Sequence, residues 1–406
     1  MQSLLPPSAI SKVLMPRHVN GRVLLITAMA LGLAALAIRD TQAHKNVTSP
    51  YLYNQEVFPL LRDKCGRCHV ENGPAPMGLL TYNDGPNSAT PWAEGIRELV
   101  ISEQMPPWYV DPLGPAVKGG DSYALTPSDT DKLITWATGG TPQGDPDKKP
   151  APITFPPRWS AGPPDLKIQM EAEYTVPEAT ADETKEFVLS TGLTDTRWVK
   201  AVDLMPGSPS VVRNAVISVD NGPILAVWVP GDESIAAPSG AAFRLPAGAK
   251  LRLQIHYKKQ WSMEGKAIKD RSTVGLYFSD PPASGREIQS LAIDAPTGQV
   301  GESNPLTGTL VAAARVVAVR PSLDQVYGTM TVQAVTPTGT KVPLLKLRNP
   351  RPEWRRRYWL AEPVELPAGS RIEIAVTAPG LYIDLTGARL MKTYPLQVAL
   401  DFVPQG

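Results

Sequence analysis

Histidine and cysteine are scarce in this chain, which has 4 histidines and 2 cysteines among 406 residues. A structural zinc site commonly takes four cysteine or histidine ligands, and a catalytic zinc site takes about three. The small supply of nitrogen and sulfur ligands therefore makes a zinc centre a poor explanation of the sequence. It also excludes the dense disulfide framework of a small secreted scaffold.

An excess of either charge is missing as well. The 40 lysines and arginines nearly balance the 39 aspartates and glutamates, which leaves a formal net charge of +1. Such a balance gives no general attraction to nucleic acid or to an anionic membrane, so we expect no nucleic-acid partner. Aromatic residues make up only 7% of the chain, whereas proline reaches 43 residues. This composition favours short strands and frequent turns over long helices.

The apolar run near the N-terminus, Val23 to Ile38, is shorter than the about 20 residues that a bilayer span needs. Basic residues precede it at Arg17 and Arg22, and small residues suit a cut after Ala43. Residues 1–43 are therefore predicted to be an export signal, with an uncleaved N-terminal anchor as the alternative. In either case we expect the remaining chain to lie outside the cytoplasm, in the periplasm.

Both cysteines belong to one motif, the sequence CGRCH at residues 65–69. A disulfide between Cys65 and Cys68 would close a very small loop and would stabilise little by chain entropy. The flanks also lack the βαβ pattern of a thioredoxin-like redox pair. On an exported chain, C-x-x-C-H matches the covalent attachment of a c-type haem. We therefore predict one haem c, with Cys65 and Cys68 bonded to its vinyl groups and His69 as the proximal iron ligand.

Three segments with helical periodicity surround the motif. They cover residues 53–68, 88–102 and 125–140. Ser88 or Thr90 is a candidate cap for the second, and Thr126 or Ser128 for the third. Three helices, the first ending at the haem motif, resemble a class I cytochrome c domain. The resemblance implies a small all-α domain over residues 44–140.

That family commonly takes its sixth iron ligand from a methionine in an MPP segment. Here the sequence EQMPPWY places Met105 in this position, and Met77 in PAPMGLL is the alternative. A thioether opposite a histidine favours reduced iron, which suits electron transfer. Either methionine is also explained as a filler of core space, and an iron that is open or otherwise ligated is a further alternative.

Beyond a proline-rich spacer at residues 141–159, the pattern changes to strands of period two. The sequences LPAGAKLRLQIHY from Leu245 and LPAGSRIEIAVTA from Leu366 form an internal repeat. Their separation suits one sandwich domain for each copy. The predicted fold is multidomain, with the small all-α cytochrome c domain followed by two antiparallel β-sandwich (jelly-roll-like) domains at residues 160–303 and 304–406.

The order of the segments RWVKAVDLMPGSPSVVRNAVISV, WVPG, LPAGAKLRLQIHY and VGLYF is similar to that in copper type II, ascorbate-dependent monooxygenases, which are peptidylglycine hydroxylase-like. More closely, the chain resembles bacterial exported proteins that fuse a c-type cytochrome to that two-sandwich module. The resemblance implies one copper held by three histidines in the first sandwich. It implies a second copper held by a His-x-His pair and a methionine in the second sandwich.

Most of the implied copper ligands are missing. The adjacent histidine pair falls on Arg213 and Asn214, and the His-x-His strand falls on residues 319–328, which contain no histidine. Only His256 keeps its place, and Cu(II) sites favour several nitrogen ligands. Strand alternation puts His256 on a polar face, where an exposed side chain is expected. We therefore treat His256 as a vestigial copper ligand at most, and Arg213 as a candidate fixed cation in the vacated cleft.

Two further features leave alternatives open. A cut after Ala43 would make His44 the mature N-terminus, and a histidine-brace copper site would then need His256 as its second histidine. The basic stretch KLRNPRPEWRRRYW at residues 346–359 is a candidate docking face for an acidic partner or for haem propionates. An ordinary solvated strand and loop explains it equally well.

The predicted function is single-electron transfer by a periplasmic c-type cytochrome with one covalent haem, in which the sandwiches serve as a binding or assembly module. No catalytic residue is assigned. One alternative is a copper-dependent oxidoreductase that receives electrons from the haem, and the small number of histidines disfavours it. Another is a scaffold subunit of a membrane-associated redox complex. The expected partner is a redox protein, either soluble or within a membrane-bound complex.

Overall fold

A computed structural model describes most of the chain. The described residues are 29, 48–107, 110–119, 123–148, 151, 159–295, 300–379 and 395–405. The predicted export segment lies outside them apart from Met29, and so do His44 and much of the predicted spacer. From Ser49 onward the chain forms one compact unit. Within the described residues, no helix has both the length and the apolar character needed to cross a bilayer.

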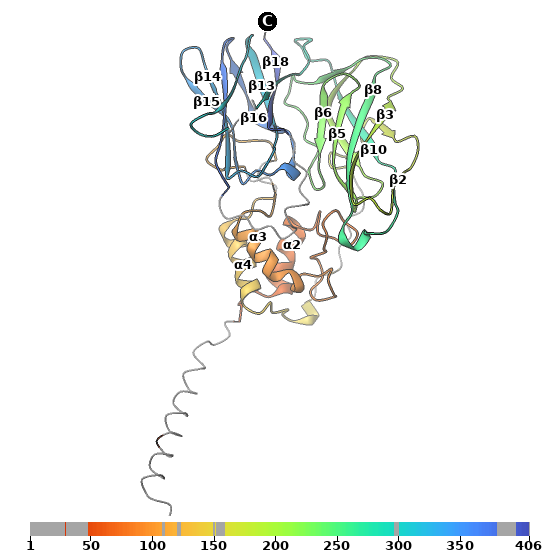
Figure 1. Ribbon diagram of the computed structural model, residues 1–406, viewed down its shortest axis with the longest axis vertical. Helices are drawn as coiled ribbons and strands as arrows, with labels where there is room; N and C mark the ends of the chain where they lie inside the picture. Colours follow the sequence, from red (N-terminus) through yellow and green to blue (C-terminus); the bar gives the residue numbers. More distant parts are fainter. Residues whose placement is uncertain are drawn as a thin grey trace, which may run out of the picture. The chain divides into compact units, whose positions relative to one another are not determined.

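The described α-helices are short and come early in the chain (Figure 1). The α-helices are α2 (Phe58–Lys64), α3 (Ala93–Ile101) and α4 (Pro127–Thr138). Shorter helical turns are η1 (Tyr53–Val57), η2 (Thr90–Trp92), η3 (Pro146–Lys148), η4 (Trp261–Met263) and η5 (Pro352–Trp354). Helix α4 begins with a capping box between Thr126 and Asp129, which confirms the predicted cap. The three α-helices share a core around Leu61 and Trp136.

The expectation of an all-α cytochrome c domain over residues 44–140 is wrong. Only three short α-helices are present there, and long irregular stretches separate them. Part of the connection between α3 and α4 pairs with distant β-structure, because Val110 bridges Leu347 and Val117 bridges Leu360. Helical periodicity marked the helices correctly, but it carries no information about a connection that bonds to a sheet more than 200 residues away in the sequence.

Antiparallel β-sheets make up most of the remaining structure, as predicted (Figure 1). The first sandwich has one sheet in the order β1 (Leu166–Gln169), β10 (Thr273–Ser279), β4 (Arg197–Met205), β7 (Phe243–Leu245). Its second sheet has the order β3 (Asp182–Ser190), β8 (Lys250–Lys258), β5 (Val212–Val219), β6 (Ile224–Trp228). Strands β2 (Tyr174–Val176) and β9 (Ile268–Asp270) form a separate two-stranded ribbon.

The second sandwich has the same plan. One sheet has the order β11 (Gln289–Asp294), β18 (Gln397–Pro404), β13 (Ala314–Ser322), β16 (Tyr358–Leu366). The other has the order β12 (Leu306–Thr309), β17 (Arg371–Val376), β14 (Thr329–Val335), β15 (Lys341–Arg348). Strand β11 already belongs to this sandwich, so the change of sandwich falls between β10 and β11, ahead of the boundary at 303 that the repeat suggested.

The internal repeat of the sequence corresponds to equivalent places in the two sandwiches. The first copy connects β7 to β8 and the second connects β16 to β17, and each of β8 and β17 is the second strand of its sheet. The turns use Gly248 with φ +69° and Gly369 with φ +79°, a conformation that glycine adopts without steric cost. The shared LPAG sequence therefore records the same turn in both sandwiches.

The two sandwiches also pack against each other. Strand β13 is buried along nearly its whole length, and its residues Val317 and Ala318 join the core of the first sandwich. Trp359 and Val403 of the second sandwich belong to the same cluster. The sheet that contains β13 is therefore covered on both faces, one by its own sandwich and one by the other.

Candidate functional site

The CGRCH motif forms a tight turn that continues α2. The amide of Cys65 donates to the carbonyl of Leu61 at 2.9 Å, and the amides of Cys68 and His69 both donate to the carbonyl of Cys65, at 3.1 and 3.0 Å. This backbone pattern gathers the two thiols and the imidazole at the end of one helix. Both cysteines are free and partly buried.

Burial controls the chemistry of the two thiols. It raises the pKa of Cys65 to about 12 and the pKa of Cys68 to about 11. Dithiol redox catalysts instead have a thiol whose pKa is lowered, because the thiolate is the reactive form. These thiols therefore do not suit a thioredoxin-like exchange reaction, which was one interpretation of the motif.

The imidazole of His69 is held by one backbone contact. Its Nδ1 lies 3.2 Å from the carbonyl oxygen of Met77, and a carbonyl can only accept, so Nδ1 carries the proton. The lone pair is then on Nε2, the arrangement found in most metal-ligating histidines. Burial lowers the pKa of His69 to about 4, so the ring is neutral at pH 7.

A loop folds back over the motif and closes this side of the site. The amide of Ala75 donates to the carbonyl of Cys68 at 3.1 Å, and the amide of Leu79 donates to the carbonyl of His69 at 3.0 Å. Gly73 lies so close to the motif that a β-carbon there would be 2.7 Å from the carbonyl oxygen of Cys68. The loop thus packs closely against the backbone of Cys68 and His69.

The structure separates the two candidate methionines. Met77 supplies the carbonyl that bonds Nδ1 of His69, and its side chain packs against the helical core. It therefore lies on the side of the imidazole that faces away from Nε2. This geometry fits a packing role for Met77 and leaves Met105 as the candidate.

Met105 follows the end of α3 in a turn with a specific geometry. The amides of Glu103 and Gln104 donate to the carbonyls of Val100 and Leu99, at 3.1 and 2.9 Å, which is the Schellman pattern. Glu103 has a φ of +53°, although glycine is the usual residue at this position. The amide of Met105 also donates to Leu99, at 3.1 Å. Met105 is therefore presented by a tightly bonded helix end.

The second sandwich clamps this turn. Arg348 forms an ion pair with Glu103 at 2.9 Å, and Arg351 donates to the side-chain carbonyl of Gln104 at 3.2 Å. Both arginines belong to the basic stretch that the sequence marked as a candidate docking face. Part of that stretch is thus engaged within the chain, at the two residues that precede Met105.

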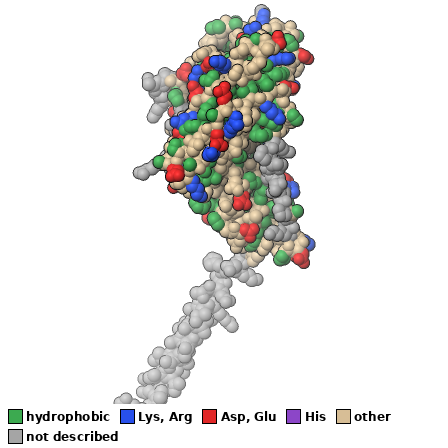
Figure 2. Space-filling model, turned by 90° about the vertical axis from the view of Figure 1, so that its right-hand side faces the viewer, with side chains coloured by type: hydrophobic (Ala, Val, Ile, Leu, Met, Phe, Trp, Pro, Cys, Tyr) green, Lys and Arg blue, Asp and Glu red, His purple; other side chains and the backbone are tan. Residues whose placement is uncertain are grey.

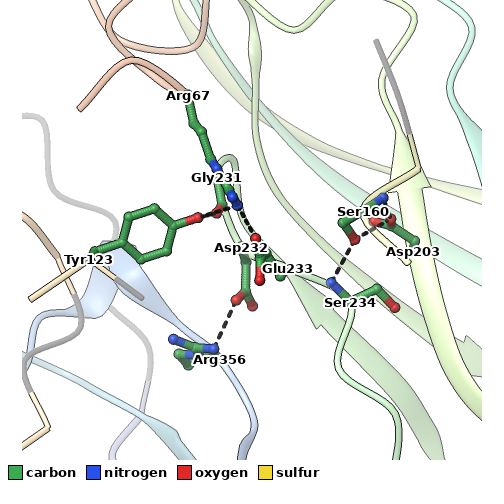
Figure 3. Close-up of polar contacts among 9 residues, drawn as sticks. All are labelled: Arg67, Tyr123, Ser160, Asp203, Gly231, Asp232, Glu233, Ser234 and Arg356. Carbon is green, nitrogen blue, oxygen red and sulfur yellow. Dashed lines mark hydrogen bonds and ion pairs between the residues drawn. The ribbon is translucent and has the colours of Figure 1, made fainter. Parts of the chain in front are cut away.

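The first sandwich contacts the motif through the loop at residues 230–234 (Figure 3). Arg67, which lies between the two cysteines, forms an ion pair with Glu233 and donates to the hydroxyl of Tyr123 at 2.8 Å. The hydroxyl of Tyr123 in turn donates to the carbonyl of Gly231. The thiol of Cys68 lies 3.7 Å from the carbonyl oxygen of Pro230. The motif therefore contacts this loop both through Arg67 and through Cys68.

The same loop is anchored to other parts of the chain (Figure 3). Asp232 forms a 3.0 Å ion pair with Arg356 of the second sandwich, and burial raises the pKa of Asp232 against the opposing effect of Arg356. The amide of Ser234 donates at 2.8 Å to the hydroxyl of Ser160, which donates at 2.8 Å to Asp203. Elsewhere Gln260 donates to the carbonyls of the loop that covers the motif.

Arg213 is a buried cation near the motif. It lies in β5, and its Nη1 is buried without a hydrogen-bond partner among the described residues. Burial lowers the pKa of Arg213 to about 10, while Cys68 and Asp182 are close enough to oppose that shift. A buried guanidinium without a partner is costly. Asp182 supplies a negative charge that partly offsets this cost.

His256 is buried, so the expectation of an exposed side chain is wrong. It is 5% exposed. Its Nδ1 lies 3.1 Å from the side-chain nitrogen Nδ2 of Asn214, and its Nε2 lies 2.7 Å from the carboxylate of Asp182. Alternation did place it away from the core face, but strands β3 and β5 lie on both sides of β8 and bury it. Both ring nitrogens are engaged, so in this arrangement His256 offers no lone pair to copper.

The resemblance to a fusion of a class I cytochrome with a copper monooxygenase-like module is wrong as a statement of family. The described chain is mostly β-sheet with three short α-helices, which do not form a clear cytochrome-like domain. Among the described residues, no group of three or more histidine, cysteine, aspartate or glutamate side chains is arranged to hold a metal ion. The CGRCH sequence remains as a motif without a family context.

Comparisons with known proteins supply no family either. No protein-family model matches the chain, and no curated protein matches it. A xanthan lyase of Paenibacillus aligns with 65% of this chain and 28% of its own, at 14% identity and a TM-score of 0.16. An uncharacterized protein of Listeria monocytogenes EGD-e aligns with 55% of this chain and 22% of its own, at 11% identity and a TM-score of 0.16.

An oxalate decarboxylase of Bacillus subtilis aligns with 65% of this chain and 88% of its own, at 7% identity and a TM-score of 0.14. The chain spans only 28% and 22% of the lengths of the xanthan lyase and the Listeria protein. Structural likeness at such low TM-scores carries no argument about function. The function of this chain has to be argued from its own residues.

The surface agrees with the balanced charge of the sequence. On the face in Figure 2, lysines and arginines are interspersed with aspartates and glutamates. The basic stretch of the sequence is partly used inside the chain, since Arg356 and Arg357 are buried.

What the sequence did not reveal are the residues that tie the motif to the first sandwich, such as Tyr123, Glu233 and Gln260. They act across separations of up to 187 residues, and no local pattern marks them.

Proposed function

We propose that this chain binds one haem covalently through Cys65 and Cys68, with His69 as an iron ligand, and that it transfers single electrons. The observation that carries the proposal is the contact of Nδ1 of His69 with the carbonyl of Met77. It orients a neutral imidazole with Nε2 available, next to two free thiols. The spacing C-x-x-C-H is typical of c-type haem attachment.

The attachment chemistry needs only the two thiols and a haem with its vinyl groups. Each S–H adds across one vinyl C=C bond, so a sulfur–carbon bond forms at one carbon and the hydrogen ends on the other. Nothing is oxidised or reduced in this addition. When bound, the haem supplies a one-electron Fe(III)/Fe(II) couple.

The residues of the chain then have distinct tasks in the proposal. His69 ligates through Nε2, and the carbonyl of Met77 holds its ring in place. Met105, presented by the turn after α3, would be a second iron ligand, and its thioether would favour the reduced iron. The loop that includes Gly73 covers the motif and limits the access of water.

The two sandwiches form the rest of the proposed architecture. Each follows the eight-stranded jelly-roll order, with the helical residues at the motif as a separate haem-binding part. We propose that the sandwiches wall the haem and serve as a binding or assembly module for a redox partner, either soluble or membrane-bound. The proposal includes export of the chain to the periplasm.

Expression with and without haem-attachment machinery tests the proposal. With that machinery, the purified chain should carry one haem that stays bound after denaturation, visible as haem-stained protein and as the mass increase of one haem. Cys65→Ala and Cys68→Ala should each weaken or abolish covalent attachment, and His69→Ala should change the spectrum of any haem that remains. A colourless wild-type protein would end the proposal.

No observation favours the copper-dependent alternative. A copper site in the first sandwich would need His256, and both nitrogens of that ring are occupied by Asn214 and Asp182. Ligation would therefore require breaking the 2.7 Å contact to Asp182 or the contact to Asn214. The scaffold alternative predicts the same covalent haem and differs only in the partner.

A further inference from the structure

The loop at residues 73–79, which covers the motif, holds the imidazole of His69 through its backbone. The carbonyl of Met77 accepts from Nδ1 of His69 at 3.2 Å. The amide of Leu79 donates to the carbonyl of His69 at 3.0 Å. The orientation of the ring therefore depends on where this loop is held.

Gln260 of the first sandwich holds the start of this loop. Its Nε2 donates to the carbonyls of Gly73 and Ala75, at 2.8 Å each, so both hydrogens of the side-chain amide are used. The amide of Ala75 in turn donates to the carbonyl of Cys68 at 3.1 Å. Gln260 is buried, so these hydrogen bonds form where water competes little. The start of the loop is thus bonded to the motif on one side and to the sandwich on the other.

The segment that carries Gln260 is itself anchored in the first sandwich. Strand β8 ends at the residue before Lys259, and the amide of Lys259 donates to the carbonyl of Ala181 at 2.9 Å. The ammonium of Lys259 donates to the carbonyls of Pro177 and Glu178. Gln260 therefore has a fixed position at the end of β8, and a shift of this strand end would move it.

From these contacts we infer that Gln260 is a positioning residue for His69, which acts through the loop at residues 73–79. The first sandwich is then part of the site that orients the imidazole. The inference rests on the proposed function, because this orientation matters to the haem that His69 would ligate. The hydrogen bond made by the second ring nitrogen of a metal-binding histidine raises the basicity of the ligand. A firmer bond from Nδ1 to the carbonyl therefore favours Fe(III), and a looser one favours Fe(II).

Hydrogen exchange at the amides of Ala75 and Leu79 tests the positioning, with or without haem. Gln260→Leu keeps most of the side-chain volume and removes both donors. The two amides should then exchange about tenfold faster, because two hydrogen bonds that hold the loop are lost. Gln333→Leu is the matched control, since the side-chain amide of Gln333 also donates at 2.8 Å, to Glu373 in the second sandwich.

Two results of the exchange measurement would overturn the inference. One is exchange at Ala75 and Leu79 that is as slow in Gln260→Leu as in Gln333→Leu. The other is an equal acceleration at every protected amide of the chain, because this would show a loss of global stability and not a local release of the loop.

The reduction potential of the haem-loaded chain tests the consequence for His69. Gln260→Leu should raise the potential, because the released loop weakens the hydrogen bond to Nδ1. Gln260→Asn keeps an amide on a shorter side chain, so it should raise the potential less. Gln333→Leu should leave the potential unchanged. An unchanged potential in Gln260→Leu, or an equal change in Gln333→Leu, would contradict the inference.

The failure of this inference is distinguishable from the failure of the proposed function. A wild-type chain without covalent haem would show that the proposed function has failed, and exchange at Ala75 and Leu79 would still decide whether Gln260 holds the loop. If Gln260→Leu does not fold, Gln260→Asn is used for both measurements. Exchange rates and potentials in Gln260→Asn that equal those of the wild-type chain would then overturn the inference.

Discussion

The Nδ1 atom of His69 lies 3.2 Å from the carbonyl oxygen of Met77, and this contact gives the two candidate methionines different roles. Met77 is bound to the imidazole on the side away from Nε2, and its side chain packs in the helical core. Met105 is presented by a separate turn after α3. If haem is bound as proposed, Met105 and not Met77 would therefore supply the thioether ligand.

Met105→Ala should therefore remove the spectral signature of thioether ligation from the oxidised haem protein and lower its reduction potential. Met77→Ala should keep that signature, because its carbonyl is part of the backbone. It should instead lower the free energy of unfolding by about 1 kcal/mol, less than for a fully buried methionine, because Met77 is only half-buried. Optical spectra and urea unfolding of both variants check this. Loss of the signature in Met77→Ala alone would reverse the assignment.

Glu103 has a left-handed backbone conformation immediately before the segment that carries Met105. Glu103→Gly should relieve strain of roughly 1 kcal/mol while it deletes the ion pair with Arg348. We expect global stability to change little and thioether ligation to weaken, with a larger fraction of high-spin haem. Arg348→Gln serves as the comparison, because it breaks the same ion pair without relief of backbone strain.

If Arg348→Gln leaves the spectrum unchanged while Glu103→Gly alters it, the backbone and not the ion pair positions Met105. If neither variant changes the spin state, the turn does not present the ligand. Either result would change the explanation of how Met105 is positioned. Neither would affect the assignment of Cys65 and Cys68 as the attachment residues.

The candidate site was only partly predictable from sequence. CGRCH is a local motif, and its residues need one another within a single turn, so Cys65, Cys68 and His69 could be named at once. Tyr123, Glu233 and Arg213 reach the same place from distant segments. Their roles depend on the tertiary contacts that β5 and the loop after β6 make near the motif. Neither hydrophobic periodicity nor motif spacing reveals such contacts.

Gly73 is required by its close approach to the motif. A β-carbon at Gly73 would lie 2.7 Å from both the carbonyl oxygen of Cys68 and a methyl carbon of Val70. Gly73→Ala should displace the turn that holds the cysteines, cost about 1–3 kcal/mol of stability, and reduce the yield of haem-loaded chain. Gly301→Ala is the control, because nothing lies within 4 Å of its added carbon. Equal haem yields in the two variants would contradict this.

The fold was more predictable where the signal was local. Period-two alternation identified β5, β8 and β10, and the LPAG repeat identified equivalent turns after Leu245 and Leu366. The helical part was misjudged because the residues between α3 and α4 carry no pattern that reveals their pairing with Leu347 and Leu360. The membership of β11 in the second sandwich was also missed, since only its pairing with β18 decides it.

Asp111 makes the attachment of the α3–α4 connection to the second sandwich dependent on pH. Its carboxylate accepts from the amide of Leu113 at 2.9 Å and pairs with Lys346 at 3.0 Å. These contacts lower the pKa of Asp111, against an ordinary value of about 3.9. A lowered pKa in the folded state means that the stabilisation is complete above the ordinary pKa. It is lost as the pH falls through the lower, folded-state pKa.

Asp111→Asn should therefore destabilise the chain at pH 6, and its difference from wild type should vanish in strong acid. Hydrogen exchange at the amide of Lys118, which donates to the carbonyl of Trp359 at 2.8 Å, reports this attachment directly. Asp280→Asn, at an exposed position, is the control. A difference between Asp111→Asn and wild type that is constant from pH 6 to strong acid would show that the charge of Asp111 is not responsible.

Arg357 joins the two sandwiches at a fully buried acid. Its Nε lies 2.6 Å from the carboxylate of Asp401, and Asp401 is 0% exposed. The same guanidinium donates to the carbonyls of Ile224 and Leu225 in β6 of the first sandwich. Its Cζ also lies over the rings of Phe243 and Trp359, at 5.0 and 5.2 Å from their centres.

Arg357→Met should lower the free energy of unfolding by about 3 kcal/mol, because it leaves the Asp401 carboxylate buried with only the more distant Arg320 beside it. Arg357→Lys should recover little, since one ammonium cannot replace the planar fork that reaches three acceptors. Arg357→Met/Asp401→Asn should recover only part of the loss, because it removes the unpaired carboxylate but leaves the buried Arg320 without its 3.8 Å partner. Urea unfolding measures all three, with the exposed Arg371→Met as the control. If Arg357→Met is as stable as that control, the contact between the sandwiches is held by the packing of Val317, Ala318 and Trp359 and not by this ion pair.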